Sequence, residues 1–209
     1  MPKQTFFNIA KEKRERIIKA SIDEFSEYSF NEASIARIVE NAGIPRGSFY
    51  QYFEDMKDVY KYIFYITGQE KMDFINNALL EMEKGSIFQT LRDLYSVGIK
   101  FAHSKPQLAK VGSRFLKESD SLKNEIFGQF EEKTIDFFKN LLKKGVEKGE
   151  ISKKVDIDIA AGMIYQLNIS IADYFISKPS EGDIMSILDK YLGYIDKMLY
   201  IFENGLKSE

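Results

Sequence analysis

The sequence contains no cysteine, and this absence removes several classes of function at once. Disulfide bonds, catalysis by a thiolate and cysteine-ligated zinc are all excluded. The chain also has a single histidine, His103, which argues against a structural metal site because such sites need several ligands of this kind. We therefore expect a fold that depends on packing, with no metal and no cofactor.

Long apolar runs are missing as well. No window reaches the roughly 18 consecutive apolar residues of a membrane span. The amino terminus lacks the basic segment, apolar run and small-residue cleavage site of a signal peptide. Apolar residues make up 44% and charged residues 30% of the 209 positions, the balance of an ordinary globular protein. We expect a cytoplasmic protein that does not enter a membrane.

Proline is scarce too, with only four residues in the chain. Between the prolines, apolar residues recur at three- and four-residue spacing, which predicts an all-α fold. The expected helices cover residues 9–28, 35–41, 45–52, 57–82, 87–103, 106–115, 122–145, 157–176 and 184–202. No low-complexity linker interrupts them. We expect two domains, residues 1–55 and 56–209, that meet inside packed structure.

The net charge of −2 speaks against a generally basic, nucleic-acid-binding surface, but the charge is unevenly distributed. Residues 1–19 contain six Lys or Arg residues and two Glu residues, a local charge of +4. Two interpretations of this segment remain open. It is either an electrostatic footprint for DNA phosphates or the solvated face of an ordinary helix.

The second and third expected helices are short and are joined by a tight turn at Gly43, which is the outline of a helix-turn-helix unit. Ser34 is a good N-cap for the first of them. In the second, Phe49 and Phe53 lie four residues apart and can face the core. Gly47 lets the backbone come close to DNA. The opposite side offers donors and acceptors suited to base edges and phosphates, namely Arg46, Ser48, Tyr50 and Gln51.

Residues 38–53, Ile-Val-Glu-Asn-Ala-Gly-Ile-Pro-Arg-Gly-Ser-Phe-Tyr-Gln-Tyr-Phe, resemble the signature of the tetracycline-repressor (TetR) family. The Ala-Gly turn, the small residue after a basic one and the Tyr-x-Tyr-Phe ending occur together behind a matching first helix. The resemblance covers about residues 9–60. It implies a dimeric DNA-binding regulator, usually a repressor, with an amino-terminal three-helix unit and a larger carboxy-terminal helical domain that binds a small-molecule inducer and forms the dimer.

The resemblance also assigns roles to single residues. Tyr52 matches a position that commonly touches phosphate, and Ser34 matches a Ser or Thr that caps a helix and meets a phosphate. Met56 stands where a phosphate-binding Lys is frequent, so the neighbouring Lys57 is a candidate replacement. Ser29 and Pro45 also depart from the family pattern. The groove-reading positions fall on Arg46, Gly47, Ser48, Tyr50 and Gln51.

Some of these residues allow a second interpretation. Arg37 lies in the first turn of its helix, where the helix dipole disfavours a cation, and a nearby phosphate would explain it. The alternative is a merely solvated side chain. Tyr50 and Tyr52 could instead be half-buried packing residues. Arg46 is the best candidate for a base contact, because a bidentate arginine on guanine is the commonest specific pairing.

The larger domain is expected to hold a ligand cavity between its helices. Four polar residues interrupt its apolar stripes and are candidate ligand contacts: Tyr95, His103, Gln166 and Asn168. Aromatic stripes at helical spacing are also typical of plain core, and His103 lies at a helix junction where it could cap or pack. Both interpretations stay open.

The last two expected helices predict a homodimer. From residue 184 onwards the apolar stripe is wider than one core face needs, and residues 157–174 carry a similar face. Two such helices from each subunit would build a four-helix interface. The alternative is a buried terminal helix in a monomer.

Together these features predict a transcription regulator, and not an enzyme, that binds a palindromic operator as a homodimer and is released by a small molecule. The partners expected are therefore operator DNA, an unidentified small-molecule ligand and a second copy of the chain. One rival is a ligand-independent architectural DNA-binding protein, which would have a dry, fully packed second domain. The other is a helical enzyme, against which the sequence offers one His, no Cys and no phosphate loop.

Overall fold

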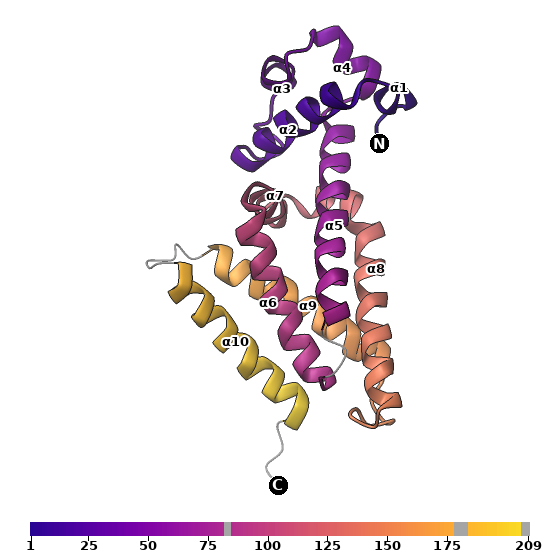
Figure 1. The fold of residues 1–209 in the computed structure, drawn as a ribbon, viewed down its shortest axis with the longest axis vertical. Coiled ribbons are helices and arrows are strands. Elements are labelled where there is room, and N and C mark those ends of the chain that lie inside the picture. The colour runs from indigo at the N-terminus through magenta and orange to yellow at the C-terminus, as the bar shows by residue number, and fades with distance from the viewer. Residues whose placement is uncertain (82–84, 178–183, 206–209) are drawn as a thin grey trace. The chain divides into compact units, whose positions relative to one another are not determined.

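The computed structural model describes residues 1–81, 85–177 and 184–205, and the regular elements in these ranges are α-helices (Figure 1). In chain order they are α1 (Gln4–Phe7), α2 (Lys11–Glu27), α3 (Ile35–Ala42), α4 (Arg46–Tyr52), α5 (Met56–Glu81), α6 (Ile87–Ser104), α7 (Pro106–Leu116), α8 (Asp120–Glu147), α9 (Ile157–Ser177) and α10 (Ile184–Asn204). The predicted all-α fold is confirmed.

The chain forms two compact units, each drawn from two stretches of sequence. The first contains residues 1–72 and 104–126, so it extends well beyond the boundary expected near residue 55. Its core is strongly aromatic. The ring of Phe25 on α2 lies 4.6 Å from that of Tyr60 on α5, and Phe64 on α5 lies 4.2 Å from Phe115 on α7. The first contact joins α2 to α5 and the second joins α5 to α7. Each aromatic pair of this kind adds about 0.5–1.5 kcal/mol beyond area burial.

The second unit contains residues 73–103 and 127–209. Its core is formed by α6, α8, α9 and α10, whose apolar residues point inward from each helix. Leu91, Leu142, Ile164 and Ile195 are buried there, one from each of the four helices. The unit is therefore a helical layer structure around one apolar core.

The expected helix bounds agree with the structure to within two residues from α3 to α10. The start of the chain differs. One helix was expected over residues 9–28, but the structure has a separate α1 and begins α2 at Lys11. The break follows from a tertiary contact, because Phe6 is fully buried with its ring 4.9 Å from that of Phe53.

Within the described ranges, none of the helices is long and apolar enough to cross a membrane. The same residues contain no group of three or more His, Cys, Asp or Glu side chains that could hold a metal ion.

Candidate functional site

A tight turn places α4 directly after α3. Gly43 adopts a left-handed conformation with φ 63°, which favours glycine because it has no Cβ. Its N–H donates to the Glu40 carbonyl and the next N–H, that of Ile44, donates to the Val39 carbonyl, both at 3.0 Å. These bonds satisfy the last carbonyls of α3. Pro45 then holds φ at −62° as the N-cap of α4, so the helix begins at Arg46, one residue later than the expected start at residue 45.

The seven residues of α4 divide into an inner and an outer face. Phe49 is fully buried, and Tyr52 and the following Phe53 are buried beside it. The outer face is solvent-accessible, with Tyr50 44% exposed and Ser48 half-buried. It carries all five residues that the sequence predicts to read a groove: Arg46, Gly47, Ser48, Tyr50 and Gln51.

Gly47 has open space around it. A Cβ built on this residue would meet no atom of the protein within 4 Å, and its φ is not in the left-handed region. The fold itself therefore does not require glycine here. A requirement would have to come from a molecule that approaches the outer face of α4.

Arg37 is held by a buried carboxylate that sequence reasoning did not identify. The side chain of Glu24 on α2 is 2% exposed and accepts hydrogen bonds from Arg37 Nη2 at 2.6 Å and Nε at 3.0 Å. The guanidinium also lies 4.0 Å from the ring centroid of Tyr28 and donates to the Glu32 carbonyl. The bond to Glu24 raises the pKa of Arg37 above its usual value. This network gives Arg37 a role in joining α2 to α3.

Ser34 occupies the N-cap position of α3 as predicted, but its hydroxyl makes no capping hydrogen bond. Instead, its backbone N–H donates to Glu24 Oε1 at 2.6 Å. Ser34 as a whole is half-buried at the start of the helix.

Two other predicted phosphate contacts also have partners within the protein. Tyr52 is 4% exposed, and Lys13 Nζ lies 5.5 Å from the centroid of its ring. Lys57 Nζ lies 2.9 Å from Glu125 Oε2, and this bond raises the pKa of Lys57. Lys61 binds the same carboxylate, and together the two ammonium groups lower the pKa of Glu125. Neither Tyr52 nor Lys57 projects freely from the surface.

In the second unit, the structure brings together two of the four predicted ligand contacts. Tyr95 is buried and its ring lies 6.5 Å from that of Tyr191. Burial raises the pKa of Tyr95, the neighbouring Tyr191 raises it further, and the nearby Asn168 lowers it. In the described part of the chain no group lies in hydrogen-bonding geometry with Tyr95 Oη. The Asn168 amide donates to the Ile164 carbonyl at 2.8 Å.

The other two predicted ligand contacts lie elsewhere. Gln166 is exposed on α9, and His103 is exposed near the end of α6. Asn168 and Gln166 are two residues apart on a helix, so they cannot share a face. Tyr95 belongs to the apolar core, and the half-buried Asn168 lies near it.

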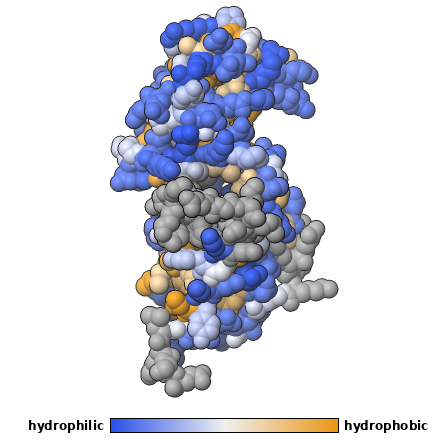
Figure 2. Space-filling view, turned by 90° about the vertical axis from the view of Figure 1, so that its left-hand side faces the viewer, coloured by the Kyte–Doolittle hydropathy of each residue, from blue (hydrophilic) through white to orange (hydrophobic). Residues whose placement is uncertain are grey.

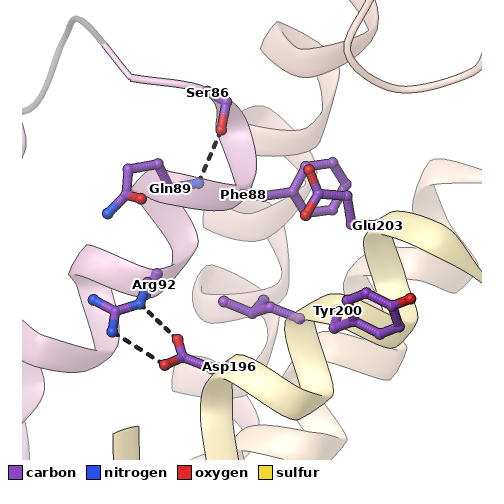
Figure 3. A pocket seen from close by; sticks show the side chains of 8 residues that line it. Ser86, Phe88, Gln89, Arg92, Asp196, Tyr200 and Glu203 are labelled. Carbon is purple, nitrogen blue, oxygen red and sulfur yellow. Dashed lines mark hydrogen bonds and ion pairs between the residues drawn. The ribbon is translucent and has the colours of Figure 1, made fainter. Parts of the chain in front are cut away.

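A separate pocket of about 280 Å³ opens between the first turns of α6 and the second half of α10 (Figure 3). The Arg92 guanidinium binds Asp196 across it, with Nε 2.6 Å from Oδ1 and Nη2 3.1 Å from Oδ2. This pair raises the pKa of Arg92. Leu199 and Tyr200 supply part of the lining. None of the four predicted ligand contacts lines this pocket, and its volume is below the usual 300–1,000 Å³ of ligand sites.

Comparison with protein families gives two matches. Residues 17–63 match the family described as "Bacterial regulatory proteins, tetR family". Residues 85–207 match "Tetracyclin repressor-like, C-terminal domain". Together the two matches cover most of the chain.

Comparison with individual proteins agrees. The chain is similar to the "Fatty acid metabolism regulator protein" of Bacillus subtilis (strain 168), with 22% identity over 179 residues, which are 85% of this chain and 90% of the relative. A TetR family transcriptional regulator from Chloroflexus aurantiacus J-10-FL has a similar structure, with a TM-score of 0.63, 28% identity and 100% of both chains covered. The regulator FadR from Bacillus subtilis in complex with stearoyl-CoA has the same fold, with a TM-score of 0.65, 19% identity and 92% and 99% of the two chains covered.

Proposed function

Because the chain belongs to the TetR family of bacterial regulatory proteins, and so is a DNA-binding transcription regulator and not an enzyme, we propose that it is a cytoplasmic repressor controlled by a fatty acyl-CoA. In this proposal a homodimer binds a palindromic operator through two copies of α4. Binding of the acyl-CoA to the second unit changes the spacing of the two helices and releases the DNA.

The outer face of α4 carries the DNA-binding part of the proposal. Arg46, Ser48, Tyr50 and Gln51 contact base edges and phosphates, and the backbone at Gly47 approaches the groove. Ser34 is a further phosphate contact. Arg37, Tyr52 and Lys57 are left out of the proposed phosphate contacts, because an ion pair already engages Arg37 and Lys57 and Tyr52 is buried. We propose that they help to hold α4 in place instead.

The choice of ligand rests on the relatives, of which one is named as a regulator of fatty acid metabolism and another was solved with stearoyl-CoA. The second unit is suited to a ligand that is mostly apolar but has a polar group. Its core is apolar, and the Tyr95 hydroxyl within it makes no hydrogen bond in the described part of the chain. Such a buried group costs about 1–3 kcal/mol. A thioester carbonyl that accepted a hydrogen bond from it would remove that cost.

The homodimer would form through α9 and α10. Ile159 and Met163 on α9 are more than half exposed, at 62% and 52%. Tyr194, Tyr200 and Ile201 on α10 are exposed as well. Figure 2 views the molecule from the side of α10 and has hydrophobic residues at the surface of this unit. Ile184, Ile187, Leu188 and Tyr174, which belong to the predicted interface, lie outside the described side chains.

Selection from a random DNA pool at two salt concentrations, followed by sequencing, tests the DNA-binding half of the proposal. We expect a palindrome whose half-sites are about one helical turn apart. A fluorescence anisotropy assay on that palindrome then tests the ligand. Stearoyl-CoA should release the DNA, whereas free coenzyme A should not. Failure to enrich a palindrome would contradict the operator, and release by coenzyme A alone would contradict recognition of the acyl chain.

A further inference from the structure

The carboxy-terminal end of α4 is capped by residues from the start of the chain. A helix leaves its last four carbonyl groups without partners inside the helix. In α4 the first of these, that of Phe49, accepts from the Phe53 N–H at 2.9 Å. The other three accept from only two residues. Lys3 Nζ donates to the Tyr50 carbonyl at 3.0 Å, and the Lys3 N–H donates to the Tyr52 carbonyl at 2.7 Å.

Thr5 completes this set, because its hydroxyl donates to the Gln51 carbonyl. The positive charge of Lys3 also lies at the end of α4 where the helix dipole favours a cation. Every one of the last three carbonyls of α4 therefore has a donor that lies more than forty positions earlier in the sequence.

Phe6 anchors these donors. It is fully buried, and its ring lies 4.9 Å from Phe53, 5.5 Å from Tyr62 and 6.0 Å from Tyr52. Figure 1 has α1 beside the end of α4, in agreement with these contacts. The segment precedes the residues that match the family, which begin at residue 17.

Such a cap matters because α4 is short. Isolated helices below about 12–15 residues are marginal in water, and α4 has seven residues. Its N-cap, Pro45, provides no side-chain hydrogen bond. Most of what orders this helix must therefore come from tertiary contacts, and Lys3, Thr5 and Phe6 supply several of those at its end.

We propose that residues Lys3–Phe6 form a clamp that fixes the end of α4, and that Lys3 and Thr5 are positioning residues for DNA recognition. The proposal rests on the role of α4 in reading the operator. Without the clamp, the last turn of α4 frays in the free protein. DNA must then order that turn on binding, so specific affinity falls while general attraction to phosphates is retained.

Hydrogen exchange of the full-length protein tests the clamp without any DNA. Thr5→Val removes the hydroxyl and keeps the shape of the side chain, and Thr5→Ser keeps the hydroxyl. Loss of one hydrogen bond should speed amide exchange in α4 about fivefold. This factor is the typical contribution of a single hydrogen bond to stability, converted to a ratio of exchange rates. Amide exchange in α9 should not change. The Thr5→Ser variant should keep the slow exchange rate of the unsubstituted protein in α4. Unchanged exchange in the Thr5→Val variant would overturn the proposal even if the protein binds no operator.

Affinity for the selected palindrome gives a second test. Lys3→Met should weaken binding about five- to tenfold, because it removes a charged donor. Lys11→Met is the matched control, since Lys11 carries the same charge and is exposed, and its ion pair in the described part of the chain is a long one to Glu15, at 3.8 Å. The control should lose less than twofold. Equal losses in the two variants, with equally reduced salt dependence, would mean that Lys3 acts as a phosphate contact and would overturn the clamp.

Discussion

The substitution Gly47→Ala separates a requirement of the fold from a requirement of DNA binding. The added Cβ meets nothing within 4 Å, so the folded protein accepts it without strain. Alanine favours a helix by about 1 kcal/mol over glycine in a helix interior. At the second residue of α4 we expect about half of this or more. The free energy of unfolding should therefore rise by about 0.5–1 kcal/mol, and the Tm by about 1–4 °C for a chain of this size.

DNA binding should respond in the opposite direction. If the backbone at Gly47 lies against the groove, a methyl group there must push α4 away from the bases. We expect at least a tenfold loss of operator affinity, which corresponds to about 1.4 kcal/mol. Gly112→Ala is a matched control in the same unit, because a Cβ at this position in α7 also meets nothing within 4 Å. Calorimetry and anisotropy together check the result. Undiminished operator affinity in a stabilised Gly47→Ala variant would refute the reasoning.

Three further predictions follow from other contacts. Arg46→Ala should weaken operator binding by about 1–3 kcal/mol and relax specificity at one base pair, while the Tm of the protein stays the same. If a repeated DNA selection gave the same base preference for the variant, a base contact by Arg46 would be contradicted. Glu24→Gln should lower the free energy of unfolding, measured in urea, by about 2 kcal/mol. This is less than the loss expected for a fully buried ion pair, because Arg37 is 40% exposed. A change below about 0.5 kcal/mol would contradict a stabilising role of the Glu24–Arg37 pair. Tyr95→Phe should leave the protein as stable or more stable, because it removes a buried hydroxyl that makes no hydrogen bond in the described part of the chain. The same change should weaken stearoyl-CoA binding in calorimetric titration, and equal affinity would exclude Tyr95 as a ligand contact.

Local patterns predicted most of the helices because apolar spacing is a property of neighbouring residues. The bounds of α3 and α4 follow from Gly43, which must adopt a left-handed conformation, and from Pro45, which suits a helix start. The short α1 could not be predicted in this way. It exists because Phe6 is buried against residues of α4 and α5, and no pattern within residues 1–10 indicates that contact.

The same distinction applies to the candidate site. The spacing of Phe49 and Phe53 is enough to identify the outer face of α4. The partners of Arg37 and Lys57 could not be inferred, because Glu24 is thirteen residues from Arg37 and Glu125 is sixty-eight from Lys57. For Arg37, the first-turn cation that suggested a phosphate has an explanation inside the protein. The buried Glu24 supplies the negative charge.

In the second unit, the four polar residues that interrupt the apolar stripes lie in different surroundings. Tyr95 is buried and Asn168 is half-buried near it. Gln166 and His103 are exposed. The difference depends on which face of each helix turns inward, and in α9 apolar residues occur on more than one face, as the exposed Ile159 and Met163 demonstrate.

The most direct test of a regulator that couples an acyl ligand to DNA is the affinity for stearoyl-CoA measured with and without saturating operator. Coupling between two sites is reciprocal in free energy. We predict that operator weakens stearoyl-CoA binding by the same factor by which stearoyl-CoA weakens operator binding. An affinity for stearoyl-CoA that is unchanged by operator would contradict it.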